Sequence, residues 1–226
     1  MQHSRDTMSI TNQHADAPQD LNNVSSLRLI FVRHGQDDES RRGGWSRFGL
    51  TTLGIKQARD IGLRIRQFIS YPFALISSDL NRARETCDYI EDALETVATY
   101  DDQWREINNG DLAGMLNAEA NVKYPGLYFS TLRYNESYSG GESPELYFRR
   151  IESTLLNTIE YLVERNLKTG IVVTHGGCIS IVYHILMKIE WSNASRAYLC
   201  LPGQSVIFEC KENIWTLKTI PEDSCR

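Results

Sequence analysis

The sequence predicts an α/β fold of three layers, with helices on both faces of a mainly parallel β-sheet. Segments 27–32 and 171–174 are almost entirely apolar and too short for helices, so we interpret them as strands buried on both faces. Segments with helical periodicity alternate with the strand segments, an order typical of parallel sheets. The length of 226 residues favours one large domain, which we place at 27–220.

The two ends of the chain differ from this domain. Residues 1–26 are rich in His, Asp, Gln, Asn and Ser and lack an apolar stretch, so we expect a disordered or loosely docked tail. The same composition argues against a signal peptide or a membrane anchor. Residues 221–226 are interpreted as a short C-terminal tail.

The first elements of the domain lead to two polar clusters. The strand over 27–32 ends directly in Arg33-His34-Gly35. A helix is predicted over 51–69, because its apolar residues recur at helical spacing. These residues are Ile55, Ala58, Ile61, Ile65 and Phe68. A second strand is predicted over 73–76. The three polar residues 77–79 follow it, and their side chains are expected to cap the next helix, which carries Arg82 near its start.

The middle of the domain is less regular. A strand around 97–104 is expected to deliver Glu106 to the same edge of the sheet. Residues 108–142 show no clear periodicity and are rich in Gly, Asn, Ser and aromatic residues. Such a long irregular stretch is usually functional, so we predict a small cap or substrate loop there.

The second half of the domain repeats the pattern of the first. Ser143-Pro144 is a favourable helix start, and the helix that follows is expected to be the longest in the protein, with apolar positions from Leu146 to Leu162. The strand over 171–174 ends in His175-Gly176-Gly177, before a helix over about 178–188. Segments 205–210 and 214–219 are predicted to form a hairpin at the sheet edge.

Composition argues against several classes of partner. The chain carries 24 basic and 29 acidic residues, a net charge of −5, and has no basic runs of the kind that bind nucleic acids. It also lacks an apolar run of roughly 18 residues, so no membrane span is expected. The five cysteines are scattered without disulfide or zinc spacing, which suits reduced thiols and a cytoplasmic location. The sequence leaves open whether the chain forms a homodimer.

The two histidines that follow strands suggest a phosphate site. Ligands of parallel sheets bind beyond the carboxyl ends of the strands, where His34 and His175 are expected to lie. Arg33 and Arg82 would make this pocket cationic, and guanidinium groups match phosphate oxygens with paired donors. Gly176 opens a helix whose first amides can bind an anion.

Two histidines are more than binding alone requires. Phosphoryl transfer uses them differently if one is a neutral nucleophile and the other a cation that stabilises the phosphoryl oxygens. The leaving alkoxide also needs a proton donor. Glu106, at the end of a predicted strand, is the preferred candidate, with Asp111 and Glu142 as alternatives.

Six motifs in sequence order resemble the histidine phosphatase superfamily, also called phosphoglycerate-mutase-like. They are Arg33-His34-Gly35-Gln36, Leu50-Thr51-x-x-Gly54-x-x-Gln57-Ala58, Ser77-Ser78-Asp79-Leu80-x-Arg82-Ala83-x-x-Thr86, Glu106-x-x-x-Gly110-x-x-x-Gly114, Gly141-Glu142-Ser143 and Thr174-His175-Gly176-Gly177. The resemblance covers about residues 27–210.

The resemblance implies a role for each matched residue. His34 would be the phosphorylated nucleophile, His175 the second pocket histidine and Glu106 the proton donor, while Arg33 and Arg82 would bind the phosphate. It implies no metal and no organic cofactor. Beyond the phosphate, Gln36 and Arg41 are candidate substrate contacts, and Arg42 is an alternative to Arg41.

The predicted activity is hydrolysis of a small phosphorylated metabolite through a phosphohistidine. Phosphoglycerate-mutase-type transfer is an alternative, but mutases carry an Asn a few residues after the Arg-His-Gly triplet and a longer loop. Here acidic residues 37–39 stand in that region and disfavour a highly anionic bisphosphate. A non-catalytic phosphate-binding domain is a second alternative. A metal hydrolase is disfavoured, because no His-x-x-x-His or clustered carboxylate spacing is present.

Overall fold

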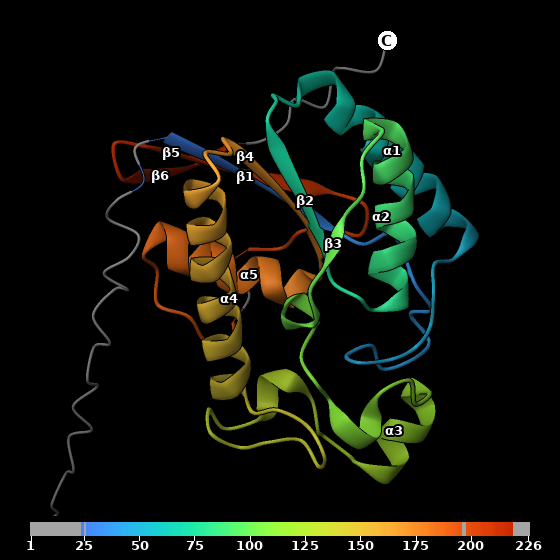
Figure 1. Cartoon of the computed structure of the whole chain (residues 1–226). Helices are drawn as coiled ribbons and strands as arrows, with labels where there is room; N and C mark the ends of the chain where they lie inside the picture. Colours follow the sequence, from blue (N-terminus) through green and yellow to red (C-terminus); the bar gives the residue numbers. More distant parts are fainter. Residues whose placement is uncertain (1–23, 25, 196–197, 219–226) are drawn as a thin grey trace, which may run out of the picture.

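The sheet of the protein has six strands in the order β3-β2-β4-β1-β5-β6 (Figure 1). The computed structural model describes residues 24, 26–195 and 198–218. The strands are β1 (Ser26–Arg33), β2 (Phe73–Ser77), β3 (Thr99–Tyr100), β4 (Thr169–Thr174), β5 (Ser205–Lys211) and β6 (Ile214–Lys218). The first four pair in parallel, whereas β5 and β6 pair antiparallel to their neighbours. A mainly parallel sheet with an edge hairpin is therefore confirmed.

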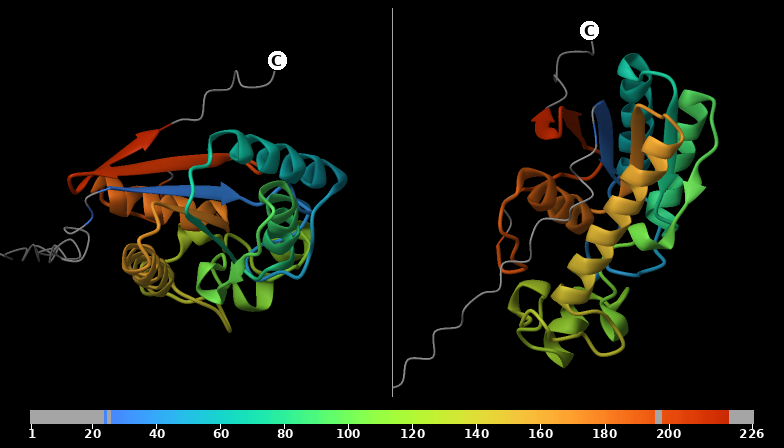
Figure 2. Two further views of the ribbon diagram at one scale, coloured as in Figure 1. Left: turned by 45° about the horizontal axis from the view of Figure 1, so that its top comes forward. Right: turned by 60° about the vertical axis from the view of Figure 1, so that its left-hand side comes forward.

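Helices cover both faces of this sheet. They are α1 (Thr52–Phe68), α2 (Asn81–Leu94), α3 (Asn117–Lys123), α4 (Pro144–Glu164) and α5 (Gly176–Met187), with short 3₁₀ turns η2 (Asp102–Trp104), η3 (Gly110–Leu112) and η4 (Phe129–Thr131). Helices α1 and α2 lie on one face, and α4 and α5 on the other (Figures 1 and 2). The three-layer αβα architecture is confirmed.

Alternate residues of β1 supply the two halves of the core. Ile30 and Val32 pack with α1 and α2, whereas Leu29 and Phe31 pack with α4 and α5. All four are fully buried. Successive side chains of a strand point to opposite faces, so an apolar residue is needed at every position, as the sequence shows.

The buried stripes of the two long helices differ in detail from the predicted ones. In α1 the stripe begins at Gly54, whose backbone packs against that of Gln36, and Ile55 is exposed. In α4 it begins at Pro144 and continues with Tyr147, while Leu146 is 54% exposed. Both wrong predictions have one cause, since a residue one position from the stripe is turned about 100° away from it. The caps predicted at the start of α4 and its greatest length are confirmed.

Two local predictions around β3 and α2 are wrong. The strand predicted over 97–104 pairs only at Thr99–Tyr100, because a 3₁₀ turn capped by Asp101 ends it. No side chain caps α2, whose N-cap residue is Leu80. Ser78 instead contacts His175, and Asp79 pairs with Arg105, so these two polar residues before α2 make tertiary contacts.

The predicted cap, residues 108–142, contains α3 and two of the 3₁₀ turns. It is not a separate body, because Leu112, Ala120, Leu132 and Tyr138 are buried in the core that includes α4 and α5. In Figure 1 this green to yellow segment with α3 lies at the bottom of the view, away from the β5–β6 hairpin. The cap thus closes one end of the domain.

The first strand begins earlier than the predicted domain boundary. Ser26 already belongs to β1, and the buried Val24 accepts a hydrogen bond of 3.2 Å from the amide of Asn213. The predicted tail, residues 1–26, therefore includes residues that belong to the domain. The rest of that tail, and the predicted C-terminal tail 221–226, lie outside the described residues. Within the described part of the chain, no helix has the length and apolar character needed to cross a membrane.

Candidate active site

His34 and His175 lie side by side at the carboxyl ends of neighbouring strands. His34 follows β1 and His175 follows β4, and the two strands pair in parallel. The amide of His34 donates a 3.0 Å hydrogen bond to the carbonyl of Thr174, which joins the two strand ends. The ring centroids are 5.1 Å apart, and both side chains are buried. The sheet thus brings together residues 141 positions apart.

The hydrogen bonds of His34 define its tautomer. Nδ1 lies 2.7 Å from the carbonyl oxygen of Gly35, and Nε2 lies 3.1 Å from Nε of Arg82. A carbonyl oxygen can only accept and a guanidinium can only donate. The proton therefore sits on Nδ1, and the lone pair of Nε2 faces Arg82. This is the arrangement that a nucleophilic Nε2 requires.

Ser78 contacts the second histidine, His175. Its hydroxyl lies 2.9 Å from Nε2 of His175 and accepts a 3.4 Å hydrogen bond from the amide of Leu80. A hydroxyl can donate to Nε2 or accept from it, so this contact does not fix the tautomer of His175. Nδ1 is buried and has no hydrogen-bond partner among the described residues. It is the ring nitrogen left for a bound ligand.

Burial and neighbouring charges favour the neutral form of both histidines. Burial, followed by the charge of Arg82, lowers the pKa of His34 well below its usual range. Burial, Arg82 and then His34 itself lower the pKa of His175 in the same way. A cationic second histidine was expected, whereas the surroundings of His175 favour its neutral form in the free site, because neighbouring guanidinium groups already supply positive charge.

Arg82 is held at the centre of the site by four contacts. Besides His34, its guanidinium donates to Ser46 Oγ at 3.2 Å and to the carbonyl of Gly44 at 2.8 Å. Asp37 Oδ2 lies 3.4 Å from its Nε. Only 2% of its surface is exposed. A buried guanidinium with a single carboxylate neighbour retains a strong attraction for an anion.

Arg33 and Gly176 contribute further hydrogen-bond donors to the site. Arg33 donates to the carbonyl of Cys200 at 2.8 Å, and its Nε is buried without a partner. Gly176 begins α5, so its amide belongs to the turn that lacks helical partners. A β-carbon at Gly176 would come within 3.3 Å of the Arg33 guanidinium. The glycine therefore lets the helix start approach the arginine.

Glu106 lies close to the start of α5. Its Oε2 accepts a 3.2 Å hydrogen bond from the amide of Gly177, and its Oε1 accepts from Tyr147 and, at 3.1 Å, from the amide of Ile107. The alternatives Asp111 and Glu142 do not line this pocket, since they pair with Ser139 and Arg150. Among the three carboxyl groups, Glu106 is the one in position to exchange a proton with a ligand.

A pocket of about 620 Å³ opens over these residues. Arg33, Glu106 and Gly176 line it, while the buried His34, Arg82 and His175 lie outside its lining. Its remaining wall is mostly aromatic and polar and comes from the cap and from the segment after α5. It includes Tyr128, Phe129, Tyr138, Trp191, Asn193 and Tyr198. The pocket can hold a phosphate ester with a sizeable alcohol part.

The two arginines after His34 lie differently. Arg42 lines the pocket, its guanidinium sits 4.5 Å over the ring of Tyr128, and its Nε is buried without a partner. Arg41, the predicted substrate contact, is not in the lining. It pairs with Asp38 at 3.0 Å and covers the ring of Phe48.

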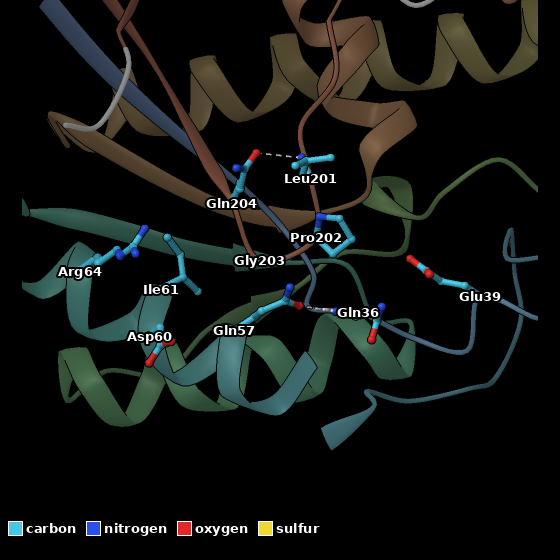
Figure 3. A pocket seen from close by; sticks show the side chains of 10 residues that line it. All are labelled: Gln36, Glu39, Gln57, Asp60, Ile61, Arg64, Leu201, Pro202, Gly203 and Gln204. Carbon is cyan, nitrogen blue, oxygen red and sulfur yellow. Dashed lines mark hydrogen bonds between the residues drawn. The ribbon is translucent and has the colours of Figure 1, made fainter. Parts of the chain in front are cut away.

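Gln36, the other predicted substrate contact, lines a second pocket of about 370 Å³ between α1 and the loop before β5 (Figure 3). There its backbone amide donates to Gln57 Oε1 at 2.8 Å, and its own Oε1 accepts from Thr51. This second pocket contains neither histidine. Arg42 is thus the arginine beyond the phosphate site that a ligand would meet, and Gln36 supports the start of α1.

Sequence reasoning missed three residues of the site. Asp37 was considered only as part of the acidic run 37–39 and not as a partner of Arg82, Ser78 was expected as a helix cap, and Tyr147 was passed over. Of the three, only Tyr147 could have been found from the sequence, because it shares the apolar helical stripe of Ile151 and Leu155. In the described segments, no group of three or more His, Cys, Asp or Glu side chains is arranged to hold a metal ion.

Comparison with known proteins agrees with this geometry. The sequence profile of the histidine phosphatase superfamily (branch 1) matches residues 29–223. The chain belongs to this superfamily. Among curated relatives, the 2,3-bisphosphoglycerate-dependent phosphoglycerate mutase of Allorhizobium ampelinum is 31% identical over 172 residues, which cover 71% of this chain and 80% of the relative.

Solved structures of the superfamily share the fold. A mycobacterial glucosyl-3-phosphoglycerate phosphatase in complex with VO3 is similar at a TM-score of 0.69 and 27% identity, covering 85% of this chain and 97% of that one. A putative α-ribazole-5'-P phosphatase of Escherichia coli is similar at a TM-score of 0.74 and 18% identity, covering 86% and 95%. The predicted family and fold are therefore confirmed.

Proposed function

We propose that this superfamily member hydrolyses phosphate monoesters through a phosphohistidine on His34. The observation that carries the proposal is the tautomer of His34, which presents the Nε2 lone pair to the Arg82 guanidinium. A phosphate bound by Arg82 would place its phosphorus beside this nitrogen. The neutral state of the ring supports the same role, because only an unprotonated Nε2 can attack.

The proposed reaction has two steps. Arg33, Arg82, the amide of Gly176 and Nδ1–H of His175 bind the phosphoryl oxygens. In the first step Nε2 of His34 forms a bond to phosphorus, the ester P–O bond breaks, and Glu106 gives its proton to the leaving oxygen. In the second, water attacks phosphorus, Glu106 takes the water proton, and the P–N bond breaks. Donors fixed in a buried site stabilise the charge that develops on the phosphoryl oxygens.

The proposed substrate is a small phosphorylated metabolite whose alcohol part carries a second anionic group. Arg42 lines the pocket, and no carboxylate of the described residues forms an ion pair with it. Aromatic rings beside it suit a ring-shaped or extended alcohol part. The solved glucosyl-3-phosphoglycerate phosphatase of similar structure supports this class of ester. Four described cysteines are free and buried thiols, which supports the proposed cytoplasmic location.

Phosphoglycerate-mutase-type transfer is the second candidate, favoured by the identity to curated mutases. Both reactions share the phosphohistidine and differ in its acceptor. Asp37 distinguishes them, because its carboxylate beside Arg82 adds negative charge where a mutase must bind a doubly phosphorylated intermediate. Hydrolysis is therefore preferred. A binding domain without catalysis would share the pocket but form no phosphoenzyme.

The test is phosphate release from a panel of phosphorylated metabolites and an aryl phosphate, with a chelator present. Wild type is compared with His34→Ala and with His184→Asn, which alters a buried histidine of α5 that does not line the pocket. We expect turnover in wild type and in the control, and at least a thousandfold loss in His34→Ala. Equal rates in wild type and His34→Ala would refute the nucleophile. Phosphoenzyme without phosphate release would indicate a mutase, and no phosphoenzyme a binding domain.

A further inference from the structure

Tyr147 places its hydroxyl between the proposed proton donor and a buried thiol. It lies in the first turns of α4, is 1% exposed, and packs edge-on against Phe129 with ring centroids 6.0 Å apart. The hydroxyl contacts Oε1 of Glu106 and lies 3.2 Å from Sγ of Cys178. A phenol at this position adds a polar group to an otherwise apolar stripe, so its hydroxyl needs a partner.

The direction of the hydrogen bond follows from the chemistry of the neighbours. Burial, followed by the charges of Cys178 and Glu106, raises the pKa of Tyr147 well above its usual range. Burial also raises the pKa of the Cys178 thiol to about 12. The phenol therefore keeps its proton. An ionised carboxyl only accepts, so Tyr147 donates to Glu106, while the thiol has the carbonyl of Arg105 as an acceptor at 3.3 Å.

The two oxygens of Glu106 are consequently unequal. Oε1 accepts from Tyr147 and from the amide of Ile107, whereas Oε2 accepts only one bond of 3.2 Å from Gly177. Oε2 is thus the oxygen with a lone pair to spare for proton exchange. Gly177 allows this arrangement, because a β-carbon there would overlap Glu106 Oε1 and the Tyr147 hydroxyl.

We propose that Tyr147 is a positioning residue for Glu106, which holds Oε1 and leaves Oε2 for proton transfer. Glu106 gives a proton to the leaving oxygen in the first step and takes one from water in the second, and both transfers then use Oε2. The inference rests on the proposed role of Glu106 as proton donor.

Several charged or titratable groups from other elements also face Glu106 or its immediate neighbours. They are Arg82 of α2, Tyr138 of the cap, Arg150 of α4, and Cys178 of α5. The Tyr147→Phe substitution removes one hydroxyl and changes none of these residues. Tyr138 offers a matched control, because it lines the same pocket and is not among the hydrogen-bond donors to Glu106.

The experiment measures kcat/KM for an alkyl phosphate, whose leaving oxygen needs a proton, and for an aryl phosphate with a weakly basic leaving oxygen, in wild type, Tyr147→Phe and Tyr138→Phe. In Tyr147→Phe we expect kcat/KM for the alkyl phosphate to fall about tenfold, the size of a lost hydrogen bond to a charged group, while kcat/KM for the aryl phosphate changes little. Breakdown of the phosphoenzyme, followed after an acid quench, should slow several-fold. Tyr138→Phe should keep the wild-type ratio of the two esters.

Distinct results separate this inference from the proposed function. If wild type turns over and Tyr147→Phe lowers kcat/KM for both esters by the same factor, Tyr147 is structural and the inference is wrong. If wild type forms no phosphoenzyme, the proposed function fails first. Should Tyr147→Phe not fold, Gly177→Ala takes its place, because its β-carbon would overlap Glu106 Oε1 and the Tyr147 hydroxyl while the phenol is kept. It must then show the same selective loss on the alkyl phosphate, and an equal loss on both esters overturns the inference.

Discussion

Nε of Arg82 donates a 3.1 Å hydrogen bond to Nε2 of His34, the ring nitrogen that the proposed reaction uses. In the free site the phosphate-binding residue therefore occupies the lone pair of the nucleophile. A phosphate that binds to Arg82 offers this guanidinium a better acceptor, since charged acceptors form stronger hydrogen bonds. In the proposed reaction, binding of the substrate thus also releases the nucleophile.

The two neutral histidines make the stability of the free protein depend on pH. Their pKa values are lowered by burial and by Arg82 from the ordinary value of 6.5. Below about pH 6.5 the unfolded chain binds protons that the native rings do not, so the free energy of unfolding falls with falling pH and stops falling below the native pKa values. Thermal unfolding followed from pH 8 to pH 5 should show this loss, and a shallower slope in His34→Asn. Equal slopes would contradict it.

Ser78→Ala should impair His175 without removing it. The proposed reaction needs the ring proton of His175 on Nδ1, which a Ser78 hydroxyl that donates to Nε2 provides, so its loss frees the other tautomer and misplaces the donor to the phosphoryl group. We expect kcat to fall about tenfold, the size of a typical single hydrogen bond. Nitrogen NMR of the imidazole should show the change of tautomer. In Ser77→Ala, which leaves the Ser78 hydroxyl in place, the His175 signals should match wild type.

Asp37 should weaken anion binding at Arg82. Removing its charge in Asp37→Asn is expected to lower the inhibition constant of orthophosphate about fivefold, the size of one charge interaction at about 4 Å in water. The control is Asp38→Asn, whose carboxylate pairs with Arg41 instead. If both variants bind orthophosphate as wild type does, Asp37 does not compete with phosphate.

Arg42 and Arg41 should separate substrate recognition from loop structure. Arg42→Gln is expected to raise KM about tenfold for phosphate esters with a second anionic group, as for one lost charged hydrogen bond. KM for a neutral aryl phosphate should not change. Arg41→Gln removes an arginine outside the pocket and should leave both KM values near wild type. Steady-state kinetics on the two ester classes check this, and the reverse pattern would favour Arg41 as the contact.

The amino-acid sequence by itself determined the framework of the site. The strand runs before His34 and His175 are almost entirely apolar, which is typical of strands covered on both faces. That pattern places both histidines at the carboxyl edge of a parallel sheet. The family motifs then predicted which arginines and which carboxyl group stand beside them. The structure places Arg82 against His34, and Arg33 and Glu106 in the lining of the adjacent pocket.

Only the tertiary structure decided which polar groups pair. Ser78 meets His175 across 97 residues, and Tyr147 meets Glu106 across 41. Such contacts depend on strand register and on the angle at which α4 and α5 pack, and local periodicity carries neither quantity. A shift of one position along α4 would turn Tyr147 about 100° away from Glu106. The residues of the site are thus readable from the chain, whereas their protonation states follow from how the layers pack.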